Sequence, residues 1–256
     1  MKIHFLGTCS GTEPMPGMHH CSFILTVNDI NYWFDAGESC AHTAFTSGVD
    51  VMKTKAIFVS HPHVDHIGGL ANLLACIRKM TVFKKTLINN NTLQIYFPDL
   101  NILQAVKTVC GALTTFTIEE HRNHEGVLFE DENIKVTAIH NDHMGEFADP
   151  EDWRSFSFLV EAEGKRLIFS GDVRSPMELD RLGAEGADLL VMETGHHHPK
   201  DVCEYAVSRK LKNLRFNHHG RVILYERPAI ERMVAEYSAK GAMSIKICYD
   251  NMIEEF

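Results

Sequence analysis

The stretch His61-Pro62-His63-Val64-Asp65-His66 stands between the apolar run Ala56-Ile57-Phe58-Val59 and the pair Gly68-Gly69, after which a helical pattern begins. Alternate residues of an extended chain point the same way, so the first two histidines can bind one metal ion. The aspartate and the third histidine follow at the turn into the helix and can bind a second ion. The stretch therefore predicts a strand-to-helix turn that holds two cations in one pocket.

Three further ligand candidates, His140, Asp172 and His218, each follow a predicted strand. Loops at the ends of a rigid sheet allow such side chains to converge. Two metal ions roughly 3.5–4 Å apart need a bridging group, and Asp172 suits this role because the preceding glycine lets the backbone approach closely. The predicted ligands are His61, His63 and His140 for the first ion, Asp65, His66 and His218 for the second, and Asp172 for both.

His219 is an alternative to His218 as the last ligand. Strand parity favours His218, because it shares the face of Leu214 and Phe216, which are expected to point into the core.

The 256 residues contain no segment that reads as a linker, so we expect one domain over residues 1–256. A net charge of −9 argues against a broad electrostatic contact with nucleic acid. The seven cysteines include no Cys-x-x-Cys pair, which favours reduced thiols and a cytoplasmic protein. No export segment and no apolar run of membrane-spanning length is apparent, so no membrane partner is expected.

Period-two alternation and turn residues predict strands in both halves of the chain, with two-residue turns at Asn28-Asp29 and Glu163-Gly164. The expected strands are Lys2–Leu6, Ser22–Val27, Tyr32–Phe34, Ala56–Val59, Leu93–Phe97, Ile134–Ile139, Ser155–Val160, Arg166–Phe169, Leu189–Met192, Leu214–Asn217 and Ser244–Ile247. Helical spacing predicts a helix around Leu70–Ile77, and further helices over Asn101–Val109, Pro199–Leu211 and Pro228–Ser238.

The ordered set of histidines and aspartates resembles the metallo-β-lactamase superfamily. The segments Phe5-Leu6-Gly7-Thr8, Trp33-Phe34-Asp35-Ala36-Gly37-Glu38 and Ser170-Gly171-Asp172 are similar to its ribonuclease Z-type branch. The resemblance implies an α/β fold, a four-layer αββα sandwich of two mixed sheets packed face to face with helices outside. It also implies a dinuclear site at one edge, usually of zinc, and a homodimer. Histidine and carboxylate ligands by themselves fit zinc, manganese or iron(II).

In that branch, a Glu-paired histidine before the last metal ligand donates a proton to the leaving group, and Glu193 and His196 occupy similar positions. His197 and His198 are alternative donors, and all three could instead cap the helix expected from Pro199. Asp35 is expected to orient a metal-binding histidine. His143 is expected to line the pocket, and His19 and His20 are candidates for the substrate mouth.

Two metal ions lower the pKa of a bridging water from about 15.7 toward about 7, and Asp65 can accept its proton. We therefore predict a metal-dependent hydrolase that acts as a phosphodiesterase, with a thioester, lactone or other carboxylic ester as the alternative substrate. A non-catalytic metal-binding sensor is the alternative from another class. No long Gly/Pro-rich insertion lies between Phe97 and Ile134, which favours a small or cyclic phosphodiester or a short nucleic acid over tRNA.

Overall fold

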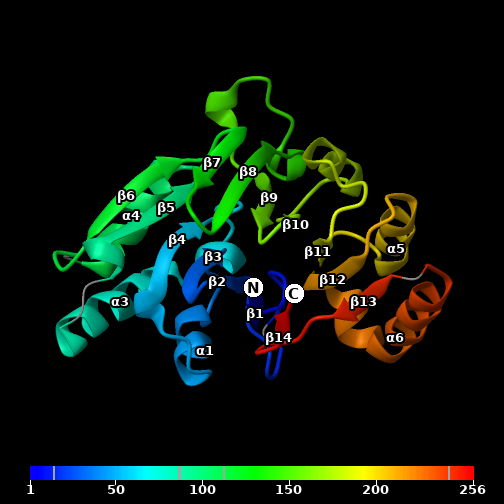
Figure 1. Cartoon of the computed structure of the whole chain (residues 1–256), viewed down its shortest axis with the longest axis horizontal. Helices are drawn as coiled ribbons and strands as arrows, with labels where there is room; N and C mark the ends of the chain where they lie inside the picture. The colour runs from blue at the N-terminus through cyan, green and yellow to red at the C-terminus, as the bar shows by residue number, and fades with distance from the viewer. Residues whose placement is uncertain (14, 86–87, 112, 242) are drawn as a thin grey trace. The chain divides into compact units, whose positions relative to one another are not determined.

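The computed structural model describes residues 1–13, 15–85, 88–111, 113–241 and 243–256, which form two compact units (Figure 1). Unit 1 contains Met1–Thr8, Pro14–Asn123 and Asp250–Phe256, and unit 2 contains Cys9–Glu13 and His124–Tyr249. Each unit draws on separate segments, so no single cut in the chain would divide them. One domain over residues 1–256 stays a prediction.

Unit 1 is built on a seven-stranded mixed sheet, sheet A, in the order β14-β1-β2-β3-β4-β5-β6. The pairings from β14 to β3 are antiparallel, and those from β3 to β6 are parallel. The strands are β1 (Lys2–Gly7), β2 (Ser22–Val27), β3 (Ile30–Phe34), β4 (Thr54–Phe58), β5 (Thr92–Phe97), β6 (Thr117–Arg122) and β14 (Ile253–Glu255).

The helices of unit 1 are α1 (Cys40–Thr46), α2 (Val64–Ile67), α3 (Leu70–Lys84) and α4 (Leu100–Cys110). The predicted helical stripe of α3 is confirmed, because Leu70, Leu73, Leu74 and Ile77 are all fully buried. They join a core with side chains of sheet A such as Trp33 and Ile57. Burying a side chain of this size contributes about 1.5–3 kcal/mol, so this core holds the helices on one face of the sheet.

Unit 2 repeats the pattern with sheet B, in the order β13-β12-β11-β10-β9-β8-β7. The pairings from β7 to β10 are antiparallel, and those from β10 to β13 are parallel. The strands are β7 (Gly126–Glu130), β8 (Ile134–His140), β9 (Phe156–Ala162), β10 (Lys165–Phe169), β11 (Leu189–Thr194), β12 (Asn213–His219) and β13 (Ser244–Ile247).

Two helices, α5 (Pro199–Ser208) and α6 (Arg221–Gly241), pack on sheet B through a second core that includes Val202, Ala206 and Ile230. Both differ in length from the prediction. α5 ends three residues early because Lys210 takes a left-handed conformation with φ 55°. α6 begins seven residues early and is kinked at Glu226, since Pro228 has no N–H to donate within the helix.

The predicted strands are confirmed within one or two residues, and both predicted turns have the positive φ angles of tight hairpins. The prediction did not include β6, β7, β14 or α1. β6 contains no fully buried residue and β14 has only three residues, so neither carries a clear apolar alternation. Within the described ranges, no helix combines the length and the apolar character that a bilayer crossing requires.

Candidate metal centre

The metal motif of unit 1 follows the carboxyl end of β4. His61 and His66 are buried, and Nε2 of His61 lies 2.9 Å from Nδ1 of His63. The ring centroids of His61 and His66 are 4.1 Å apart. The three imidazoles therefore gather at one turn, as the spacing of the motif predicts.

Asp35 supports this turn from the end of β3. Its Oδ2 lies 2.7 Å from Nδ1 of His66, and its Oδ1 accepts a 2.7 Å hydrogen bond from the backbone N–H of Ser60. The hydroxyl of Ser60 donates to Oδ2 of Asp35 and lies 3.0 Å from Nδ1 of His61. Asp35 thus holds the ring of His66 by one nitrogen, which leaves Nε2 as the nitrogen for a metal.

Close packing also shapes the motif. A Cβ atom on Gly69 would lie 2.1 Å from the carbonyl oxygen of Gly37, and one on Gly37 would lie 2.4 Å from that of Asp65. Both distances are far shorter than a van der Waals contact, so glycine is required where the turn meets the loop after β3.

In unit 2, Asp172 lies at the centre of a second group of ligands. Its side chain is buried, and the preceding Gly171 has φ 55°. Nδ1 of His218 lies 3.3 Å from its Oδ1, while Nε2 of His143 and Nδ1 of His196 each lie 3.7 Å from its Oδ2. Three of these side chains come from the segments after β8, β10 and β11, and His218 lies at the end of β12; the carboxyl ends of these strands share one edge of sheet B.

The spacing of these atoms suits a metal ion. Ligand atoms on a tetrahedral zinc, at about 2.0–2.1 Å from the ion, lie roughly 3.3 Å from one another. The 3.3 Å separation of His218 and Asp172 matches this value. Ligand atoms of Asp172, Glu193, His196 and His218 all lie within 4.8 Å of one another.

His140, the last residue of β8, is buried and has its own partners within unit 2. Its ring stacks on Trp153 with centroids 4.6 Å apart, and its carbonyl accepts a hydrogen bond from Arg181. Burial lowers the pKa of this imidazole. The chain continues past the end of β8 through a short turn that contains His143, whose Nε2 lies 3.7 Å from Oδ2 of Asp172. His140 as a ligand stays a prediction, and the contact with Asp172 makes His143 a further candidate.

The rings of His218 and His219 contact different groups. The ring of His219 lies 2.9 Å from the carbonyl oxygen of Cys248 and 3.2 Å from the hydroxyl of Thr194, and burial lowers its pKa to about 4. His218 has φ 50°, which turns its side chain to Asp172. The strand alternation used in the prediction therefore breaks at this residue.

The three consecutive histidines after β11 also differ in the groups that their side chains contact. His196, about half exposed, has its Nδ1 3.2 Å from Oε1 of the buried Glu193 and donates its backbone N–H to Oε2. Nε2 of His197 lies 2.9 Å from the carbonyl oxygen of Val173, and His198 caps α5 by accepting a hydrogen bond from Lys200. Nε2 of His197 also lies 3.3 Å from Oε1 of Glu193, but the side chain of His197 is 14% exposed, whereas that of His196 is 47% exposed.

Electrostatics couple Glu193 to its neighbours. Burial by itself would raise the pKa of Glu193, but interactions with His196 and His218 outweigh burial and lower that pKa below its ordinary value. The hydrogen bond to Glu193 raises the pKa of His196 against the opposing effect of burial. Glu193 is therefore ionised and favours a protonated, oriented His196.

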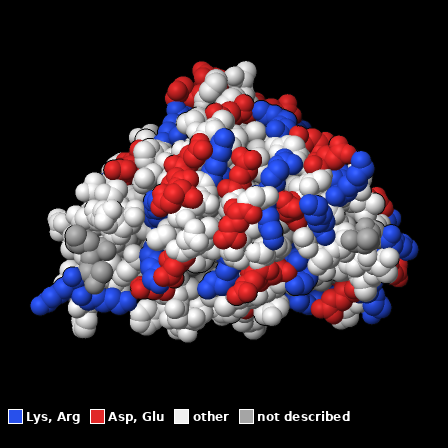
Figure 2. Space-filling view, in the orientation of Figure 1, with Lys and Arg blue, Asp and Glu red and all other residues white. Residues whose placement is uncertain are grey.

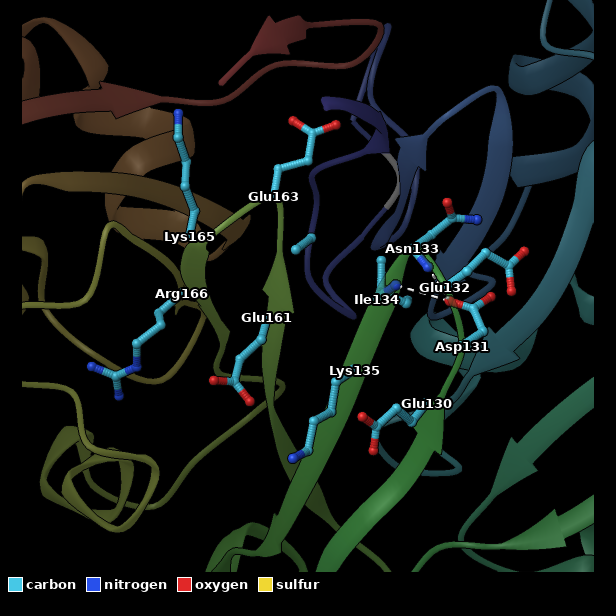
Figure 3. A pocket seen from close by; sticks show the side chains of 12 residues that line it. Glu130, Asp131, Glu132, Asn133, Ile134, Lys135, Glu161, Glu163, Lys165 and Arg166 are labelled. Carbon is cyan, nitrogen blue, oxygen red and sulfur yellow. Dashed lines mark hydrogen bonds between the residues drawn. The ribbon is translucent and has the colours of Figure 1, made fainter.

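A separate pocket of about 410 Å³ lies at the opposite end of the strands of sheet B (Figure 3). It is lined by the β7–β8 turn and the β9–β10 hairpin, where Oδ1 of Asp131 accepts hydrogen bonds from the backbone of Asn133 and Ile134. β8 begins at this pocket and ends at His140, so the pocket is distinct from the ligands around Asp172.

Comparison with known proteins agrees with this geometry. A family model described as the anti-Pycsar protein Apyc1 matches residues 1–244. Ribonuclease Z of Listeria innocua is 34% identical over 194 residues, which cover 73% of this chain and 55% of the relative. The chain thus spans about half the length of the curated relatives that it matches.

Two solved structures cover the whole chain. The metallo-β-lactamase fold protein YhfI from Bacillus subtilis superposes with a TM-score of 0.77 at 16% identity, covering 99% of that protein. The short form of human tRNase Z superposes with a TM-score of 0.74 at 20% identity, again over 99% of its length. These likenesses confirm the predicted fold class. The chain belongs to the anti-Pycsar protein Apyc1 family, a ribonuclease Z-like group within the metallo-β-lactamase superfamily.

Proposed function

We propose that this protein is a dinuclear metal-dependent phosphodiesterase. The observation that carries the proposal is the buried carboxylate of Asp172 with nitrogens of three histidines at 3.3–3.7 Å. The His61–His66 motif adds a second group of ligands with its own carboxylate support from Asp35. Such a donor set is typical of sites that activate water.

We assign each proposed ligand to one of the two metal ions from its position in the chain and from the distances within its own unit. His143 replaces His140 in the set because of its distance to Asp172. Zinc is the preferred metal, with manganese and iron(II) as alternatives. We assign His61, His63 and His143 to one ion, Asp65, His66 and His218 to the other, and Asp172 to both.

Two divalent ions at this site would supply an activated water and polarise the phosphoryl group. Asp65 accepts the proton of the attacking water. His196, oriented by Glu193, donates a proton to the departing alkoxide. The buried position of Glu193 keeps this pair aligned without a competing solvent contact.

The proposed substrate is a small or cyclic phosphodiester or a short nucleic acid. Ribonuclease Z among the relatives acts, by its name, on RNA. In this chain α4, β6 and β7 occupy most of the described residues between Phe97 and Ile134, which leaves no long insertion there to contact a large RNA. Charges of both signs are interspersed over the face seen in Figure 2, and the net charge is −9. A small anionic substrate held by metal ions needs no extended basic surface.

The test is a substrate screen with bound metal measured in parallel. Purified protein would be assayed on bis-p-nitrophenyl phosphate, a cyclic nucleotide, a thioester and a lactone. We expect turnover of the phosphodiesters, about two metal ions per chain, and loss of both turnover and metal in His63→Ala. His42→Ala is the matched control, because this histidine is exposed on α1 of the same unit.

The screen also separates the competing functions. Turnover of only the thioester or the lactone would replace the phosphodiesterase by a carboxylic ester hydrolase. Two bound ions without turnover of any substrate would favour a metal-binding sensor. A purified protein with only trace metal would contradict all three functions, because each of them requires bound metal.

We further propose that the protein is cytoplasmic and dimeric. None of the seven cysteines, all of which lie within the described ranges, forms a disulfide, which suits a reducing compartment. The exposed apolar side chains Val82 and Phe83 on α3 and Val109 on α4 would be covered by a second copy. Light scattering that gives the mass of one chain at assay concentration would contradict the dimer.

A further inference from the structure

Three buried polar side chains, Asn141, Ser157 and Ser170, form a continuous hydrogen-bond network in unit 2. Nδ2 of Asn141 donates to Oγ of Ser157 at 2.9 Å, and the hydroxyl of Ser157 donates to the carbonyl oxygen of Ser170 at 2.6 Å. Each of these residues is at most 3% exposed. They lie just after β8, on β9 and just after β10, which are neighbouring strands of sheet B (Figure 1). The network therefore crosses three strands at the edge where the ligand candidates of this unit lie.

Both ends of the network bind backbone groups beside ligand candidates. Oδ1 of Asn141 accepts a 3.2 Å hydrogen bond from the backbone N–H of His143. At the other end, the hydroxyl of Ser170 donates to the carbonyl oxygen of Gly171 at 2.6 Å. Gly171 directly precedes Asp172. The segments that carry His143 and Asp172 are thus joined through side chains as well as through the sheet.

A third segment joins the network at Ser170. Its Oγ accepts a 3.0 Å hydrogen bond from the backbone N–H of Glu193, whose carboxylate holds His196. Within the network, the amide of Asn141 donates to the hydroxyl of Ser157, and that hydroxyl donates onward in the same direction. Hydrogen bonds arranged in such a chain polarise and strengthen one another. The ends of β8, β10 and β11 are therefore held together by one buried polar network.

The surroundings of Ser157 suit an apolar side chain better than a hydroxyl. Ser157 shares its face of β9 with Leu159 and lies opposite Ile139 of β8, and both of these residues belong to the apolar packing of unit 2. A buried hydroxyl without a partner costs about 1–3 kcal/mol. The two hydrogen bonds of Ser157 remove this cost and connect the ends of two strands. A role in positioning those ends accounts for a polar residue at this place.

Ser155 provides a comparison within the same segment. Its side chain is fully buried, but its hydroxyl has no hydrogen-bond partner among the described residues. The backbone carbonyl of Ser155 accepts a 3.0 Å hydrogen bond from the N–H of Asn141, and this contact does not require the side chain. The two buried serines thus differ in whether the hydroxyl belongs to the network.

We propose that this network fixes the separation between His143 and Asp172 and thereby sets the affinity of the centre for metal. Nε2 of His143 lies 3.7 Å from Oδ2 of Asp172, and the network holds the backbone beside each of them. Asn141 and Ser157 are positioning residues, because they act through the two ligand candidates. The inference rests on the proposed function, since it concerns ligands of the same site.

The experiment compares zinc affinity in Ser157→Ala and Ser155→Ala, measured by competition with a chromophoric chelator. Each variant loses one buried hydroxyl, but only Ser157→Ala breaks the network. Loss of a contact that orients a metal ligand typically weakens metal binding by roughly 10- to 100-fold. We expect a loss of this size for one of the ions in Ser157→Ala. Ser155→Ala should bind zinc as the wild-type protein does.

Asn141→Ser separates the network from the local turn at His143. A serine can still accept the backbone N–H of His143 as a capping residue does, but it lacks the amide that donates to Ser157. We expect the same loss of zinc affinity as in Ser157→Ala. The double variant should lose no more than either single variant, because both changes remove one link. Wild-type affinity in Asn141→Ser, or additive losses in the double variant, would overturn the proposal.

Cobalt(II) absorption adds a measurement that a general loss of stability would not change. The d–d bands of bound cobalt(II) depend on ligand geometry, so they should change in Ser157→Ala while its far-UV circular dichroism matches the wild-type signal. Unchanged bands, or equal losses of zinc affinity in Ser155→Ala, would contradict the positioning role. If Ser157→Ala does not fold, the same two measurements on Asn141→Ser decide the question.

Failure of the proposed function would give a different result. Wild-type protein that binds no more than trace zinc would overturn the proposed function, and this inference with it. Wild-type protein that binds about two ions, with unchanged affinity in both Ser157→Ala and Asn141→Ser, would overturn the inference alone.

Discussion

Adjacent histidines in this chain have different tasks because their ring nitrogens meet different partners. Within the triplet after β11, a buried carboxylate holds His196, a backbone carbonyl holds His197, and His198 caps a helix. The same contrast separates His218 from His219 and His143 from His140. Residue type alone therefore does not assign a role in this protein.

The roles of His143 and His140 can be separated by metal content. His143→Ala should reduce the metal bound per chain from about two ions toward one, because the variant removes a nitrogen beside the carboxylate of Asp172, the proposed bridge. His140→Ala should keep both ions, since that ring stacks on Trp153. Elemental analysis of both variants after the same purification is the measurement, and the reverse order of loss would restore His140 as the ligand.

The proton-donor role of His196 predicts a dependence on the leaving group. His196→Ala should lower turnover by roughly 10²–10⁴-fold on a phosphodiester with a poor alkoxide leaving group. The loss should be much smaller with a p-nitrophenolate, which departs without a proton. Steady-state kinetics on the two substrates provide the comparison, and Glu193→Gln should give a milder form of the same pattern. A loss that is equal on both substrates would rule out general acid catalysis by this residue.

At the scale of elements, parallel strands bring the ligands together while helices supply the stability. β10, β11 and β12 run in the same direction, so the loops that follow them emerge at one edge of sheet B. α3 follows the motif of unit 1 directly and buries a full apolar stripe against sheet A. Chemistry and stability therefore depend on different residues of neighbouring elements.

This division predicts a large stability effect at Leu73. The side chain is fully buried in the core of unit 1, so Leu73→Ala should lower the free energy of unfolding by about 2–5 kcal/mol. Lys79→Ala on the same helix is the matched control, because its side chain is exposed and should change stability by less than about 0.5 kcal/mol. Urea unfolding followed by circular dichroism measures both, and similar effects would contradict the assignment of this core.

At the scale of the whole molecule, each unit has its own apolar core between its sheet and its helices. The proposed ligands lie at or just beyond strand ends, with Asp65 and His66 on the short helix α2, and none of them belongs to these cores. The fold should therefore depend less on metal than catalysis does.

Metal removal tests this expectation. Treatment with a chelator should abolish turnover but preserve most of the far-UV circular dichroism signal, and adding zinc back should restore activity. A chelated protein that loses its secondary structure would show that the metals are structural. An assay started at the moment when the chelator is added, before the protein loses metal, controls for direct inhibition of the protein by the chelator.

Much of the fold was accessible from the sequence. The alternation of apolar residues located the strands, and Asn28-Asp29 and Glu163-Gly164 located two hairpin turns, because these signals are local. β6 and α1 were not predicted, since neighbouring strands and helices stabilise them more than their own patterns do. Pro228 was predicted to start a helix because proline favours the first helical turn, but it lies inside α6, just after the kink at Glu226.

The sequence by itself determined the superfamily, the motif from His61 to His66 and the bridging candidate Asp172, because residue types at fixed spacings carry that information. Only the tertiary structure decided which of several nearby histidines faces Asp172 and which carboxylate holds each ring. Those choices depend on where strands end, on the positive φ of His218 and on partners distant in the chain, such as Asp250, whose Oδ2 lies 2.8 Å from Nδ1 of His19. Such contacts between distant segments form only when the chain folds, so no local pattern encodes them.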